Sequence, residues 1–177
     1  LLDAMEKAGA VRLTENEINQ LTARAIQTVG EGNDRHDVPA KEFLGQDAAV
    51  LARAIGKQVS ADTPLLFGEV DESNPFVPVE QMMPFLPFVR CRNAEEAIAK
   101  AQQYEHGFRH TAIIHSNNVR NMTRMGRVMD TTLFVKNGPC MSALGLGGEG
   151  YLSFSIATPT GEGMTSPLTF AAPGATE

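Results

Sequence analysis

Apolar residues recur at helical spacing in the first part of the chain. Between Thr14 and Gly30 they recur every three or four positions, which predicts one amphipathic helix with Gly30 at its end. Thr14 and Glu17 have the spacing of a capping box, in which each residue satisfies a free amide at the helix start. We expect further helices to end at Gly9 and to cover residues 46–56. The chain between them is predicted to hold a short strand at 10–13 and a polar loop at 30–43.

Strand-like and helix-like segments alternate from residue 60 to residue 137. The apolar runs predict strands and the amphipathic runs predict helices. This order favours an α/β fold with a mostly parallel sheet flanked by helices, in which we expect 85–91 to be buried. Ligand sites of such sheets lie beyond the carboxyl ends of the strands, which points to the loop after Asn137 and the loop that holds Glu80. The predicted strands are 63–70, 85–91, 111–116 and 131–137, and the predicted helices are 93–107 and 117–129.

Composition and charge narrow the possible partners. The 177 residues carry a net charge of −6, which disfavours nucleic acid and anionic membranes as partners. Two cysteines far apart give no disulfide framework and fit a reducing cytoplasm. No apolar run approaches the roughly 20 residues of a membrane span. The chain starts with neither an initiator methionine nor a signal-peptide pattern, so we expect it to be the middle of a longer protein.

A glycine pattern near the end of the chain resembles a nucleotide-binding fingerprint. Gly145, Gly147 and Gly150 form a literal G-x-G-x-x-G. In a dinucleotide site a helix follows at once and its N-terminus holds the pyrophosphate. Here the alternating segment 151–159 follows and no helix is indicated. The glycines are therefore interpreted as a flexible loop that lines a pocket.

The cysteines and histidines leave several interpretations open. Cys140 is either a nucleophile, activated by a neighbouring cation, or a pocket-lining thiol without reactivity. His106 and His110 are four residues apart, as in a helical metal pair, but Gly107 interrupts the helix, so no metal site is predicted. His110 stands at the start of a strand, from which it could reach a pocket. Glu80 is either a surface carboxylate or an acceptor for ribose hydroxyls. The second interpretation follows from the prolines that constrain its loop.

Three arginines recur on one face of the helix predicted at 117–129. Such a face can bind phosphates, but a solvated face is the simpler interpretation. The residues are Arg120, Arg124 and Arg127.

Five motifs occur together and in order in the second half of the sequence. They are NPFVPVEQMMPFLPFVR, HGFRHTAIIHSNNV, TTLFVKNGP, GLGGEG and TPTGEG. Together they resemble the C-terminal half of the CoA-acylating propionaldehyde and acetaldehyde dehydrogenases of bacterial microcompartments, members of the aldehyde dehydrogenase superfamily. The resemblance implies an oxidoreductase in which a cysteine forms a thioester with the aldehyde, hydride passes to NAD, and the acyl group passes to coenzyme A.

The resemblance also assigns residues. Glu80 matches the glutamate that binds the nicotinamide ribose, and Met82 matches the residue that packs near the nicotinamide. The nucleophilic cysteine is expected upstream of Leu1, so no catalytic residue is assigned and the chain alone is expected to be inactive. The substrate pocket is expected to be lined by Asn137, Gly138, Pro139, Cys140 and Met141. His110 is also expected near this pocket, from its position at a strand start and not from a family motif.

Domain extent, partners and location follow as expectations. Residues 1–170 should form a portion of the catalytic domain, and 171–177 should be a frayed tail. Exposed sheet edges favour a homo-oligomer. The expected partners are a small aldehyde and the remaining part of the enzyme, with neither nucleic acid nor a membrane. The expected location is the cytoplasm or the lumen of a bacterial microcompartment. A non-catalytic scaffold that keeps the fold remains the alternative.

Overall fold

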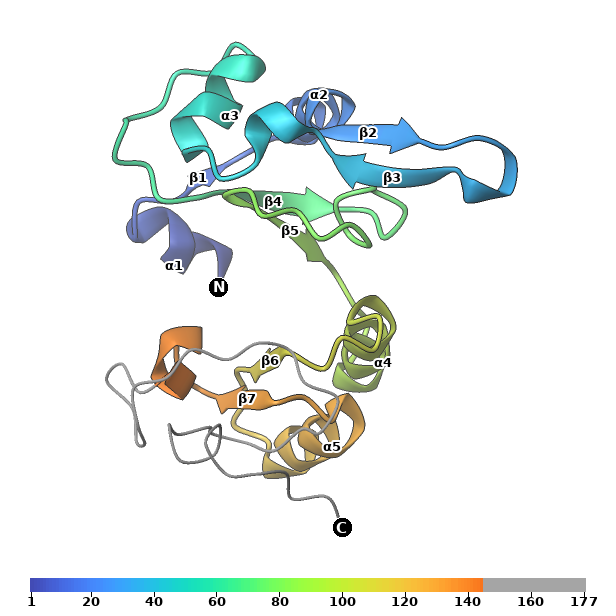
Figure 1. Ribbon diagram of the computed structural model, residues 1–177. Coiled ribbons are helices and arrows are strands. Elements are labelled where there is room, and N and C mark those ends of the chain that lie inside the picture. The colour runs from blue at the N-terminus through green and yellow to red at the C-terminus, as the bar shows by residue number, and fades with distance from the viewer. Residues whose placement is uncertain (145–177) are drawn as a thin grey trace, which may run out of the picture. The chain divides into compact units, whose positions relative to one another are not determined.

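The computed structural model describes residues 1–144 and divides the chain into two compact units (Figure 1). The first unit is Leu1–Arg90 and the second is Cys91–Glu177. Each unit has its own sheet and its own core, so each is described by itself.

A three-stranded parallel sheet organises the first unit. Its strands are β1 (Val11–Arg12), β4 (Leu66–Val70) and β5 (Phe85–Val89), in the order β1-β4-β5 (Figure 1). All three strands run in the same direction, with Leu66 opposite both Val11 and Phe85. Their carboxyl ends therefore meet at one edge of the sheet, where the sequence predicted a ligand site.

Helix α2 (Glu15–Ala25) begins as the sequence predicts. The Glu17 amide donates to Thr14 Oγ1 at 3.4 Å, and the Thr14 amide donates to Glu17 Oε2 at 2.8 Å, which confirms the capping box. Leu21 and Ala25 are fully buried on the helix face that meets the sheet. The other helices of this unit are α1 (Leu2–Lys7) and α3 (Ala48–Ala54), which confirm the two short helices predicted on either side.

The predicted end of this helix is wrong. Helix α2 stops at Ala25, and the next four residues form strand β2 (Ile26–Val29), which pairs antiparallel with β3 (His36–Pro39) (Figure 1). Ladder hydrogen bonds to β3 and the β-branched side chains of this segment override its helical spacing. The prediction of a polar loop over 30–43 is wrong for the same reason. The connecting turns are η1 (Gly32–Asp34) and η2 (Lys41–Phe43).

The first unit buries one apolar core between the sheet, α2 and α3. Phe76, from the connection between β4 and β5, is 1% exposed, and its ring lies 4.6 Å from the ring of Phe85. This contact fixes part of a long connection to the sheet. The prediction that β5 is a buried strand is wrong beyond Phe85, because Leu86 is 42% exposed on this outer strand of the sheet.

The second unit pairs two helices with a two-stranded parallel sheet. Strands β6 (Thr111–Ile114) and β7 (Leu133–Lys136) pair from Thr111 with Leu133 to Ile114 with Lys136. All four elements confirm the predicted alternation of helix and strand, and the core is formed by Ile98, Ala112, Met125 and Met129. The helices are α4 (Ala94–Tyr104) and α5 (Val119–Met129), and η3 (Cys140–Leu144) follows β7.

Asparagine side chains start both helices of the second unit. Asn93 Oδ1 accepts from the Glu96 amide at 2.9 Å, and Asn118 Oδ1 accepts from the Asn121 amide at 3.2 Å. The three arginines of α5 are exposed, as expected of a solvated face, and Arg124 bridges to Glu95 at 2.7 Å. Within residues 1–144, no helix combines the length and apolar character that a membrane crossing requires.

Candidate functional site

The connection between β4 and β5, residues 71–84, carries the first candidate segment. It leaves the carboxyl end of β4 and is tied down at its start by Asn74. Asn74 Oδ1 accepts from the Phe76 amide at 2.9 Å, and Asn74 Nδ2 donates to Thr22 Oγ1 on α2 at 3.3 Å. The Asn74 hydrogen bonds and the buried Phe76 ring therefore fix this connection to the rest of the first unit.

Glu80 and Met82 point outward from the second half of this connection. Both are exposed, and the Met82 side chain is 75% exposed with a backbone φ of 48°. The Met82 carbonyl accepts from the Gly45 amide at 3.1 Å, which fixes the backbone there. The same anchored loop thus exposes a carboxylate and an apolar thioether two residues apart in the sequence. This pair can accept hydroxyl hydrogen bonds and cover an aromatic ring.

Gln81, between them, was not singled out from the sequence. Its Nε2 donates to the Phe76 carbonyl at 2.7 Å, and its Oε1 is buried. The only signal in the sequence is its position between two residues that the family resemblance assigns to the cofactor.

The second candidate segment follows the carboxyl end of β7. Asn137 has a φ of 53°, and its amide donates to the Ile114 carbonyl at 2.9 Å. Its side chain binds both backbone groups of Ser116, so Asn137 continues the sheet by one step and then turns the chain. Pro139 and Cys140 are exposed, and Met141 is 51% exposed. Gly138 is half-buried in the same turn.

His110 lies at the opposite end of this sheet from Asn137. His110 directly precedes β6 and its carbonyl accepts from the Leu133 amide at 3.0 Å, whereas Asn137 follows β7. The four residues of a strand lie between the backbone positions of His110 and Asn137, so these positions are about 13 Å apart along the strand direction. The His110 side chain is exposed, with Nδ1 2.5 Å from Thr111 Oγ1. Within the second unit, the structure groups Asn137 to Met141 but does not bring the His110 backbone to them.

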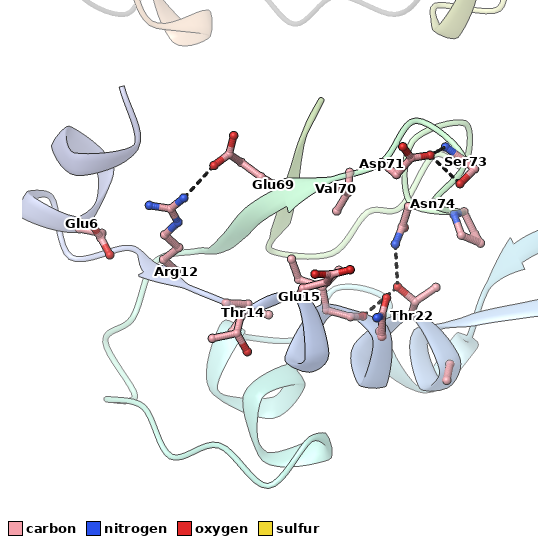
Figure 2. A pocket seen from close by; sticks show the side chains of 15 residues that line it. Glu6, Arg12, Thr14, Glu15, Thr22, Glu69, Val70, Asp71, Ser73 and Asn74 are labelled. Atoms are coloured by element: carbon pink, nitrogen blue, oxygen red, sulfur yellow. Dashed lines mark hydrogen bonds and ion pairs between the residues drawn. The ribbon is translucent and has the colours of Figure 1, made fainter. Parts of the chain in front are cut away.

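A surface hollow of about 850 Å³ lies over the carboxyl ends of β1 and β4 (Figure 2). Among its lining residues, Arg12 Nη2 contacts Glu69 Oε2 at 2.8 Å, and Asn74 Nδ2 donates to Thr22 Oγ1 (Figure 2). The sequence pattern does not predict this hollow. Its charged lining is one arginine and four carboxylates, which disfavours an anionic ligand; the carboxylates are Glu6, Glu15, Glu69 and Asp71.

The carboxylates of Glu17 and Glu96 have lowered pKa values. Burial tends to raise the pKa of Glu17, but hydrogen bonds from Lys57 and Thr14 outweigh it, and the net pKa is lowered. Lys57 Nζ lies 2.6 Å from Glu17 Oε1. Hydrogen bonds from the Arg92 backbone and side chain lower the pKa of Glu96. Both groups lie at helix starts, so they stabilise the fold and have no evident part in chemistry.

The described part of the chain contains no cluster of three or more histidine, cysteine, aspartate or glutamate side chains that could hold a metal ion. Helix α4 ends at Tyr104, before the pair His106 and His110, so these two residues do not share a helix. The glycine pattern at 145–150 and the predicted tail at 171–177 lie outside the described residues.

No family model matches the chain, but curated proteins do. The acetylating acetaldehyde dehydrogenase of Salmonella typhimurium is 46% identical over 170 residues, which is 96% of this chain and 36% of that protein. The CoA-propanoylating propanal dehydrogenase of Citrobacter freundii is 42% identical over 172 residues, which is 97% of this chain and 36% of that protein.

Solved structures give the same result. A propionaldehyde dehydrogenase of Rhodopseudomonas palustris with bound propionyl-CoA has a TM-score of 0.81 and 42% identity, over 93% of this chain and 35% of that one. A propionaldehyde dehydrogenase from the fucose utilisation bacterial microcompartment of Clostridium phytofermentans has a TM-score of 0.79 and 36% identity, over 93% of this chain and 36% of that one.

The matched portion of the relatives is shorter than the C-terminal half that the motifs suggested. The chain spans about a third of the length of the curated relatives it matches, at 36% of their residues. The identity nevertheless runs across almost the whole of this chain and agrees with the structural match. The chain belongs to the CoA-acylating aldehyde dehydrogenases of the bacterial-microcompartment type, of which it is a fragment.

Proposed function

We propose that the chain supplies binding segments to an enzyme that converts a small, propionaldehyde-like aldehyde, NAD and coenzyme A to acyl-CoA and NADH. The observation that carries this proposal is the 46% identity to an acetylating acetaldehyde dehydrogenase over 96% of the chain. Its relatives of known structure include one with bound propionyl-CoA and one with bound NADP⁺.

The proposed chemistry proceeds in two steps. A cysteine thiolate adds to the aldehyde carbon, and loss of hydride from the resulting thiohemiacetal leaves a thioester. The hydride is accepted by bound NAD. The thiolate of coenzyme A then attacks the thioester carbon, the carbon–sulfur bond to the enzyme breaks, and the cysteine leaves as a thiolate. The Rhodopseudomonas palustris relative has been solved with bound CoA and an acylated cysteine, which supports such a thioester.

The cofactor end of the site is assigned to Glu80 and Met82. The Glu80 carboxylate is exposed and can accept hydrogen bonds from both hydroxyls of a ribose. The exposed Met82 side chain can lie against a nicotinamide ring, since thioethers make favourable contacts with aromatic rings. The anchored connection between β4 and β5 reduces the conformational entropy that such contacts would cost.

The substrate end is assigned to the segment after β7. Cys140 and Met141 are exposed there and can form an apolar wall for a short acyl chain, with Gly138 and Pro139 shaping the turn. Asn137 has a different part in this proposal, because both ends of its amide are bound to Ser116. It holds the segment in place. The assignment of His110 to the pocket rests only on its position at the start of a strand.

The nucleophile is assigned to a cysteine outside residues 1–177. In this proposal Cys140 is a wall residue and Cys91 is structural. The partners are the aldehyde, coenzyme A, NAD, the remainder of the enzyme and further copies of it. The microcompartment origin of the Clostridium phytofermentans relative supports a location in a microcompartment lumen.

Coupled formation of NADH and acyl-CoA tests the proposal. The full-length enzyme and the isolated chain should each be assayed with propionaldehyde, NAD and coenzyme A. We expect turnover by the full-length enzyme that depends on coenzyme A, and none by the isolated chain. A full-length protein without turnover on any short aldehyde would overturn the assignment.

A further inference from the structure

We propose that Gln81 is a positioning residue that holds Glu80 and Met82 in the geometry that binds the cofactor. This inference rests on the proposed function, because it takes Glu80 and Met82 as the cofactor contacts. Gln81 itself touches neither substrate nor cofactor in this proposal, since its side-chain amide turns into the protein.

The three residues alternate in direction along the loop. Glu80 and Met82 are exposed, whereas Gln81 is half-buried and its Oε1 is inaccessible to solvent. Gln81 is covalently bonded to both neighbours, so its inward attachment restrains the backbone from which Glu80 and Met82 extend. A shift of the Gln81 amide would therefore move both of them.

The anchor of Gln81 is a fixed point of the core. Gln81 Nε2 donates to the Phe76 carbonyl at 2.7 Å, and Phe76 is 1% exposed with its ring against Phe85. The bond closes the segment from Phe76 to Gln81, which includes Pro78 and therefore has little backbone freedom. On the other side, the Met82 carbonyl accepts from the Gly45 amide. Glu80 thus lies between two fixed attachments.

The other end of the same amide carries an independent signal. Gln81 Oε1 is buried and has no hydrogen-bond donor among the residues that the structure describes. Buried polar atoms are nearly always paired, and an unpaired one destabilises the folded state. An apolar side chain of similar length would avoid this loss of stability but could not bind the Phe76 carbonyl. The Gln81 amide therefore fixes the loop through the Phe76 carbonyl, while its unpaired oxygen lowers the stability of the fold.

Two variants of the full-length enzyme separate positioning from folding. Gln81→Met keeps the length and loses the hydrogen bond, and Gln81→Glu keeps an oxygen but, when ionised, cannot donate to the Phe76 carbonyl. Gln102→Met is the matched control, because Gln102 Nε2 also donates to a backbone carbonyl, that of Val128, at 2.9 Å. It lies in the second unit, on helix α4.

We expect the KM for NAD to rise about three- to tenfold in both Gln81 variants, which corresponds to the loss of one hydrogen bond. The value of kcat and the KM for propionaldehyde should stay within about twofold, and NADH titration by fluorescence should show the same loss of affinity. Gln102→Met should leave all of these unchanged.

An unchanged KM for NAD would overturn the inference. So would equal changes in all kinetic constants together with a lowered Tm, or a failure of both Gln81 variants to fold, because these outcomes indicate a purely structural residue. An inactive wild-type enzyme would instead overturn the proposed function. NADH titration then still compares the variants without turnover, and equal affinities would reject the inference as well.

Discussion

The side-chain amide of Asn137 binds both backbone groups of Ser116. Asn137 Oδ1 accepts from the Ser116 amide at 2.8 Å, and Asn137 Nδ2 donates to the Ser116 carbonyl at 2.9 Å. The side chain therefore takes the place of a neighbouring strand at Ser116, two residues beyond the end of β6. The left-handed backbone of Asn137, with a φ of 53°, then directs the chain into the segment assigned to the substrate.

Asn137→Gly should distinguish the contribution of the side-chain hydrogen bonds to stability from that of the backbone conformation. Glycine adopts a positive φ without strain but cannot bind Ser116, so we expect a loss of about 1–3 kcal/mol in the free energy of unfolding. Urea denaturation of the chain measures this loss. Asn33→Gly, in the exposed turn between β2 and β3, is the control for the glycine itself. Equal losses in the two variants would show that the Ser116 contact contributes nothing.

Gly68 in the central strand β4 should not tolerate a side chain. An added Cβ would lie 2.6 Å from Ile18 Cδ1 and 3.1 Å from the Leu13 carbonyl, so the buried Ile18 side chain would have to shift within the core. We expect Gly68→Ala to lower the free energy of unfolding by about 1–3 kcal/mol. Adding Ile18→Val, which removes the Cδ1 atom, should recover part of the loss. A double variant no more stable than the expected sum of the single effects would contradict this packing.

The capping box of α2 should make part of the stability depend on pH. The folded pKa of Glu17 is lowered, because hydrogen bonds from Lys57 and Thr14 outweigh burial. The contribution of the ionised carboxylate is therefore complete above its unfolded pKa, near 4.5, and is lost as the pH falls through the lower folded value. Glu17→Gln should reduce stability by about 1 kcal/mol at neutral pH and less in acid.

Chemical denaturation at several pH values from about 3 to about 7 tests this dependence, because a carboxyl group titrates within that range. Glu15→Gln is the matched control, since Glu15 is exposed in the same first turn of α2. If the two variants lose stability equally at every pH, Glu17 has no special part in the capping box.

The Met82 side chain should contribute to cofactor binding and not to the stability of the fold. Its side chain is 75% exposed on a left-handed backbone, so it gains little from burial and costs strain. We expect Met82→Gly to leave the Tm unchanged or raised while the KM for NAD of the full-length enzyme increases severalfold. His106→Gly, at a φ of 58°, is the control, because it relieves similar strain in the second unit. A lowered Tm in Met82→Gly would refute the strain.

The sequence predicts helix starts better than helix ends in this chain. Thr14 and Glu17 mark the start of α2 because the capping box is formed by neighbours in the sequence. The end at Ala25 depends on pairing of β2 with β3, and β3 is largely exposed, so it has no hydrophobic pattern. A strand without a buried side chain leaves little trace in the order of polar and apolar residues.

The residues of the candidate site also differ in whether the sequence predicts them. Glu80 can be selected from the sequence because prolines constrain its loop and the surrounding motif resembles a known family. Gln81 cannot, since its inward direction depends on where the core places the Phe76 carbonyl. The pairing of Asn137 with Ser116 also depends on the register of β6 and β7, which the sequence alone does not specify.

Mapping the acylated cysteine tests the central claim most directly. The full-length enzyme is incubated with propionaldehyde and NAD without coenzyme A, so that the thioester accumulates, and its peptides are then analysed by mass spectrometry. The account predicts a propionyl group on a cysteine outside residues 1–177, removed when coenzyme A is added, with Cys91 and Cys140 unmodified. A propionyl group on Cys140 that coenzyme A removes would contradict it, because this chain would then contain the nucleophile.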